Sequence, residues 1–208
     1  MTLTAEKFSQ GRSTQGYIDQ MKVNKQPFLE IYQAVEVPSD VLSYYNSLSQ
    51  PLNLVVFHAE WCGDAVSTTP AVLKLAESTS NISVQVFNRD EEVDLTNTFL
   101  PDYRANTVPV FVVFDQDMNE IARFIETAKA LVPQIDAMDE MIAREVANEG
   151  DNARNVARGK RTAFRVAHGK EWGNVILHEF CQVVKDGLAL PADQRPAVGG
   201  TEWPAPEN

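Results

Sequence analysis

A buried strand that runs directly into a cysteine-bearing turn is the feature that most constrains this chain. Residues 54–57 form an apolar run of the kind found in buried strands. The residues that follow are His58, Ala59, Glu60, Trp61, Cys62, Gly63, Asp64 and Ala65, and a helical pattern begins there. Cys62 is therefore predicted at a helix N-terminus, where backbone N–H groups and the helix dipole stabilise a thiolate. The pattern indicates a reactive atom without naming a substrate.

Composition restricts the class of partner. The 208 residues are 44% hydrophobic and 23% charged, as is typical of a globular protein. The net charge of −11 opposes general binding to nucleic acid or to an anionic membrane surface. No apolar run approaches the ~20 residues of a membrane span, and no basic segment followed by an apolar core opens the chain. We therefore expect a cytoplasmic protein whose thiols are reduced.

The order of predicted elements indicates an α/β fold with a mixed sheet. Strands are expected at residues 53–58, 82–87, 107–114 and 120–126, with a helix between the first two and a tight turn between the last two. Such a βαβ unit followed by a hairpin places parallel and antiparallel pairs in one sheet. The helix after Cys62 contains Pro70, which should kink it.

Three segments are expected along the chain. Residues 1–49 form an N-terminal helical extension and residues 50–148 form the central domain. Residues 149–208 form a C-terminal extension, with a polar linker at 149–162 and a helix at 172–187. From Leu190 onward four prolines and two adjacent glycines favour an irregular tail.

Four features of this order resemble the thioredoxin-like family. They are Ala59-Glu60-Trp61-Cys62-Gly63 at the strand–helix junction, Pro70 eight residues after Cys62, Val108-Pro109 before a buried strand, and the hairpin and helix that follow. The resemblance covers about residues 50–146. It implies a thioredoxin-like mixed sheet flanked by helices, here with helical extensions at both ends, and a cis proline at Pro109 that lies against Cys62. The chain is similar to a bacterial branch with a Cys-Gly-Asp-Cys type motif.

The chain departs from the family pattern at three places. Ala65 stands where the family has its second, resolving cysteine, either as a native loss or as an engineered Cys→Ala change. Val56 occupies the position of a buried aspartate that many thioredoxins keep, and the accompanying lysine would fall near Val86 or Phe87. The usual proton-handling groups and the second thiol are therefore missing.

The resemblance implies a thiol–disulfide oxidoreductase of thioredoxin type with Cys62 as nucleophile. Ala65 marks the missing partner, and the expected substrate groove consists of Trp61, Gly63, Asp64, Val108 and Pro109. The alternative is a redox-silent thioredoxin-fold module that binds a protein or peptide. The carboxylates of Glu60 and Asp64 oppose the helix N-terminus in stabilising a thiolate, and the sequence leaves this competition open.

Protein or peptide thiols and disulfides are the expected partners, with glutathione as a weaker candidate because acidic residues flank the thiol. Neither a cofactor nor a metal is expected, since three histidines and two cysteines show no ligand spacing. Cys181 is predicted to be a buried core residue, although the cysteine count alone also allows a Cys62–Cys181 disulfide. The oligomeric state is left open. A basic cluster indicates a solvated face or intramolecular charge pairing; it consists of Arg154, Arg158, Lys160, Arg161, Arg165 and Lys170.

Overall fold

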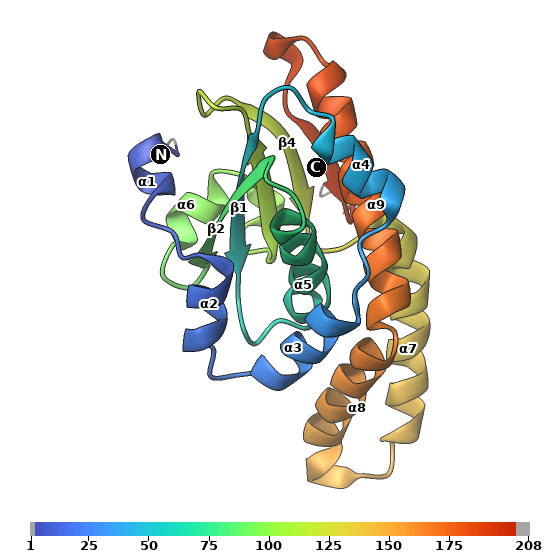
Figure 1. Cartoon of the computed structure of the whole chain (residues 1–208). Coiled ribbons are helices and arrows are strands. Elements are labelled where there is room, and N and C mark those ends of the chain that lie inside the picture. Colours follow the sequence, from blue (N-terminus) through green and yellow to red (C-terminus); the bar gives the residue numbers. More distant parts are fainter. Residues whose placement is uncertain (1–2, 203–208) are drawn as a thin grey trace.

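The computed structural model describes residues 3–202, which fold around a five-stranded sheet. Helices cover both faces of this sheet (Figure 1). The strands are β1 (Leu52–His58), β2 (Ile82–Asn88), β3 (Val110–Phe114), β4 (Glu120–Ile125) and β5 (Ala197–Gly200). The helices are α1 (Ala5–Phe8), α2 (Thr14–Gln20), α3 (Lys25–Ala34), α4 (Ser39–Asn46), α5 (Gly63–Glu77), α6 (Val93–Asn97), α7 (Val132–Glu145), α8 (Ala153–Ala167) and α9 (Gly169–Ala189). Short 3₁₀ turns occupy Asp102–Arg104, Lys129–Leu131, Gly150–Asn152 and Ala192–Gln194.

The sheet has the order β2-β1-β3-β4-β5. Strand β1 pairs parallel with β2 and antiparallel with β3, and β3 and β4 form the expected hairpin. Strand β5 then adds to β4 in parallel. The α/β class and the thioredoxin-like mixed sheet are thus confirmed.

Alternating side chains of the central strand serve two hydrophobic cores. In β1, Leu54 and Val56 face the core beneath α3, α5 and α9, whereas Val55 and Phe57 face the smaller core that includes residues of α6. All four are at most 1% exposed. A strand buried on both faces reads as a continuous apolar run, which explains the pattern at residues 54–57. Figure 1 shows α5 and α9 on the opposite side of the sheet from α6.

Two parts of the C-terminal extension differ from expectation. Residues 153–162, predicted as a polar linker, belong to α8. The outer face of this helix is so strongly charged that its narrow apolar face is difficult to recognise from sequence. Residues 197–200, predicted as irregular, form β5. This strand gains its hydrogen bonds from β4, more than seventy residues earlier in the chain, so local composition does not reveal it. Residues 203–208 of the expected tail lie outside the described residues.

Helix α9 and a buried arginine fix the C-terminal extension to the sheet. Gly187 of α9 comes so close to β4 that a Cβ atom there would lie 2.2 Å from the Ile121 carbonyl oxygen. Arg104 donates to the Thr201 carbonyl oxygen at 2.6 Å and to the Glu126 carboxylate at 2.8 Å, which secures the chain just after β5. The expected helix that contains Pro70 is continuous from Gly63 to Glu77. Across residues 3–202, no helix is both long and apolar enough to cross a membrane.

Candidate functional site

Cys62 occupies the N-cap position of α5, at the end of the turn that leaves β1. Its backbone N–H bonds to the Ala59 carbonyl at 3.1 Å and its carbonyl accepts from Val66 at 3.0 Å, which begins the helix. The thiol is partly exposed and Sγ donates to the Val108 carbonyl oxygen at 3.3 Å. The Val108–Pro109 peptide bond is cis. Two predicted site segments, 46 residues apart, therefore meet at the thiol.

Burial raises the pKa of the Cys62 thiol above its ordinary value. Backbone N–H groups of Ala65 and Asp64 at the start of α5 lower the pKa, as a helix N-terminus should. The Asp64 carboxylate raises the pKa, and the Arg165 guanidinium lowers it. Loss of hydration, which the sequence argument did not weigh, is the largest of these causes and outweighs the helix N-terminus, whereas Glu60 is not among the groups that shift the pKa of Cys62.

Arg165 of α8 lies directly against the cysteine motif. Its Nη2 donates to Asp64 Oδ1 at 3.1 Å, and its side chain is only 8% exposed against 30% for that of Asp64. A Cβ atom on Gly63 would lie 2.9 Å from Cζ of Arg165, so the missing side chain makes room for the guanidinium. Within the predicted basic cluster, Arg165 is therefore buried in an ion pair and does not lie on a solvated face.

The second predicted carboxylate beside the thiol, Glu60, has a different role. It accepts the backbone N–H groups of Lys22 and Val23, both at 2.7 Å. Asn24 donates to the Glu60 carbonyl oxygen at 2.7 Å. These bonds attach the motif to the segment between α2 and α3, so Glu60 holds the N-terminal extension against the site.

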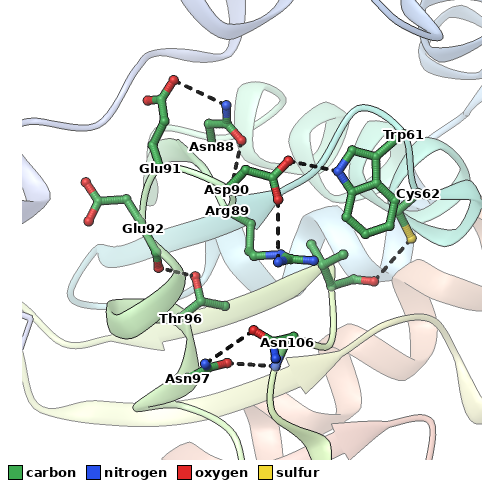
Figure 2. A network of polar contacts seen from close by, with 11 residues as sticks. Trp61, Cys62, Asn88, Arg89, Asp90, Glu91, Glu92, Thr96, Asn97 and Asn106 are labelled. Atoms are coloured by element: carbon green, nitrogen blue, oxygen red, sulfur yellow. Dashed lines mark hydrogen bonds and ion pairs between the residues drawn. The ribbon is translucent and has the colours of Figure 1, made fainter.

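Trp61 covers a small polar network on the other flank of Cys62 (Figure 2). The indole is exposed, and its Nε1 donates to Asp90 Oδ2 at 2.8 Å. The Arg89 guanidinium lies 5.2 Å from the Trp61 ring centroid, within cation–π range, and its Nη1 is 3.4 Å from Asp90 Oδ1. This network holds a large apolar surface beside the thiol.

No second thiol lies next to Cys62. Ala65, at the resolving position, is fully buried in the first turn of α5. Cys181 is 1% exposed within α9, and both cysteines are free. The predicted core location of Cys181 is confirmed, and the Cys62–Cys181 disulfide is absent from the structure. Val56 and Val86, where the family's proton-handling groups would stand, are buried apolar residues.

His58 is buried at the end of β1 and belongs to the core. Its Nδ1 is 3.0 Å from Thr69 Oγ1, and the rings of Tyr17 and Phe28 meet it edge-on. Burial lowers the pKa of His58 to about 3, so the ring is neutral at ordinary pH. Within residues 3–202, no three His, Cys, Asp or Glu side chains are grouped to hold a metal ion.

Sequence reasoning did not single out Arg89, Asp90 or Arg165 as site residues. Arg165 and Asp64 are 101 positions apart in the chain, so no local spacing connects them. Asp90 and Trp61 are 29 positions apart and belong to different loops. The sequence anticipated one of these contacts in general terms, because intramolecular charge pairing was one interpretation of the basic cluster that contains Arg165.

Comparisons with known proteins agree with this architecture. A family model described as thioredoxin matches residues 11–140. A thioredoxin from Chlamydia pneumoniae is 32% identical over 78 residues, which are 38% of this chain and 72% of that protein. A protein of unknown function from Pseudomonas aeruginosa, 18% identical, has a TM-score of 0.57 and the match covers 81% of this chain and 99% of that one. An HIV epitope-scaffold, 15% identical, has a TM-score of 0.51 over 79% of this chain and 96% of its own.

The last two likenesses show the fold alone, because both are far below the identity at which function can be compared. The family model carries more weight, since it spans the cysteine motif, the Val108–Pro109 segment and the hairpin, and covers more than half of the chain. The chain belongs to the thioredoxin family.

Proposed function

We propose that this protein carries out thiol–disulfide exchange at Cys62. The observation that carries the proposal is the position of the thiol, which is partly exposed at the N-terminus of α5 and within 3.3 Å of the Val108 carbonyl oxygen. In this proposal an extended substrate lies along Trp61, Gly63, Asp64, Val108 and Pro109, the residues expected to form its groove.

The exchange begins when the Cys62 thiolate attacks one sulfur of a substrate disulfide. A bond forms between Cys62 Sγ and that sulfur, the substrate S–S bond breaks, and the released thiolate takes a proton from water. Ala65 provides no second thiol to resolve the mixed disulfide, and Cys181 is buried in α9. An external thiol must therefore attack the mixed disulfide to regenerate Cys62.

Protein or peptide disulfides of the cytoplasm are the proposed substrates, because the exposed Trp61 ring offers a broad apolar surface beside the thiol. Glutathione is a candidate for the external thiol. The raised pKa of Cys62 implies that attack becomes faster as pH increases toward that pKa, since only the thiolate reacts.

Turnover of a generic protein disulfide tests the proposal. Without added thiol, the parent chain should form one mixed disulfide per molecule and keep it, whereas an Ala65→Cys variant should release the reduced substrate by forming a disulfide between its two motif cysteines. Residues three apart in a helix have Cα atoms about 5 Å apart, a separation that a disulfide can bridge. A Cys62→Ser/Ala65→Cys variant is the matched control. Absence of reaction in both the given chain and Ala65→Cys would refute thiol–disulfide exchange.

The second candidate is a redox-silent module in which the same groove binds a protein or peptide. The upward shift of the Cys62 pKa and the lack of a neighbouring thiol favour it, because both reduce reactivity. A peptide-array measurement with the given chain and Cys62→Ser separates the candidates. Binding that persists in Cys62→Ser and in excess reductant supports the module, and binding that disappears in both supports covalent exchange.

A further inference from the structure

The cysteine motif is in contact with a helix that the family model does not include. The match to the thioredoxin model ends at residue 140, and α8 begins at residue 153. Arg165, near the end of α8, nevertheless packs on Gly63 and pairs with Asp64, the two residues that follow Cys62. The C-terminal extension thus contributes a charged group to the site that the thioredoxin-like sheet alone would lack.

We propose that Arg165 is a positioning residue that holds the Asp64 carboxylate and thereby sets how readily Cys62 loses its proton. The inference rests on the proposed function in that it assigns Cys62 the role of nucleophile. It goes further because it assigns the C-terminal extension, through Arg165, an influence on the ionisation of Cys62.

The packing of Arg165 fits this role better than a purely structural one. The residue is 7% exposed, yet within residues 3–202 its guanidinium makes a single hydrogen bond, the one to Asp64, and its buried Nε has no partner. A structural arginine so deeply buried normally fills most of its donors. Here the guanidinium packs over Gly63, where a Cβ atom would lie 2.9 Å from Cζ. Gly63 thus leaves room for this cation next to the residue that bears the thiol.

Besides Asp64 and Arg165, three charged residues lie around the motif, and each has other partners. The Glu60 carboxylate accepts two backbone N–H groups from the N-terminal extension. Asp90 is bonded to the Trp61 indole, and Arg89 lies beneath that ring and beside Asp90.

Asp64 and Arg165 remain as an opposed pair at the thiol, where the carboxylate disfavours the thiolate and the guanidinium favours it. Each should therefore move the ionisation of Cys62 when it is removed, in opposite directions.

The rate of alkylation by iodoacetamide as a function of pH gives the ionisation of Cys62 directly. Arg165→Gln should raise the apparent pKa of Cys62 by about half a unit or more, because it removes the cation and leaves Asp64 unopposed. The rate at neutral pH should then fall about threefold. Asp64→Asn should lower the pKa, and the double variant should lie between the two single variants. Arg165→Lys retains the charge and should restore part of the effect.

Arg158→Gln is the matched control, since Arg158 is exposed on the same helix two turns earlier, about 10 Å away. It should leave the pKa of Cys62 unchanged. Peptide mapping by mass identifies alkylation at Cys62, and a Cys62→Ser chain gives the background from Cys181. If Arg165→Gln lowers stability without moving the pKa, Arg165 is structural and the proposal is overturned.

Asp64→Asn decides the matter if Arg165→Gln does not fold. An unchanged or raised pKa in Asp64→Asn would overturn the proposal. Alkylation needs no disulfide, so the two proposals fail separately. Opposed pKa shifts without disulfide exchange would refute the proposed function alone, and exchange without pKa shifts would refute the role of Arg165 alone.

Discussion

The close approach of α9 to β4 predicts that Gly187→Ala severely destabilises the protein. A Cβ atom at Gly187 would lie 2.2 Å from the Ile121 carbonyl oxygen and 2.9 Å from its carbonyl carbon. Ordinary carbon–oxygen contacts are about 3.3 Å, so the helix and the strand would have to separate by about 1 Å. The obstacle is backbone within a sheet, which cannot rotate away as the end of a side chain can.

The size of the effect follows from two opposed contributions. Overpacking a core costs about 1–3 kcal/mol or more, and alanine gains up to about 1 kcal/mol over glycine in a helix interior. We therefore expect a net loss of about 2 kcal/mol in the free energy of unfolding. Gly159→Ala in α8 is the matched control, because nothing lies within 4 Å of its Cβ position, and it should stabilise the protein by about 0.5–1 kcal/mol.

Urea unfolding followed by far-UV circular dichroism measures both variants. Gly187→Ala should unfold at a clearly lower urea concentration than the parent, and Gly159→Ala at a slightly higher one. Equal midpoints for the two variants would show that α9 does not lie against β4 as described. Arg165 would then lose its support, since α8 leads directly into α9.

The remaining predictions concern stability and thiol access. Because burial depresses the pKa of His58 to about 3, its neutral form stabilises the fold above pH ~6.5, and this contribution should decline by about 1.4 kcal/mol per pH unit as pH falls toward 3. Urea unfolding at pH 7 and pH 5 should therefore show a smaller loss in His58→Phe than in the parent. Arg104→Met should cost about 3 kcal/mol by leaving Glu126 and Thr201 without their buried partner, whereas Lys129→Ala, which breaks an exposed pair with Glu202, should change stability by less than about 1 kcal/mol. In the native chain an alkylating reagent should modify Cys62 and spare Cys181, with both thiols reacting in denaturant; rapid reaction of Cys181 in the native chain would contradict its burial in α9.

Much of the thioredoxin-like sheet could be predicted from local patterns. The apolar run at residues 54–57 is buried on both faces, and the turn at Cys62 begins a helix as its residues indicate. The hairpin of β3 and β4 follows from the Asp115–Asn119 turn signal, and Asp115 indeed accepts the backbone N–H groups of Asp117 and Asn119. Each of these features depends on residues close together in the chain.

The features that escaped prediction depend on contacts between distant segments. Strand β5 exists because β4 offers a free edge, and Gly200 has a positive φ of 89° close to Ile125, which a composition rich in proline and glycine does not disclose. The location of Arg165 depends on how α8 packs across the N-terminus of α5. Charge alone suggested that the basic cluster had a partner without identifying Asp64.

Cys62 is proposed to attack a disulfide without being able to release itself from the mixed disulfide. The most direct test is the intact mass of the chain after exposure to an excess of a small disulfide, followed by removal of the reagent. One mixed disulfide per chain should form at Cys62, persist, and disappear only when an external thiol is added, while Cys62→Ser forms none. A chain that forms no adduct, that loses its adduct unaided, or that carries the adduct after Cys62→Ser would contradict the account.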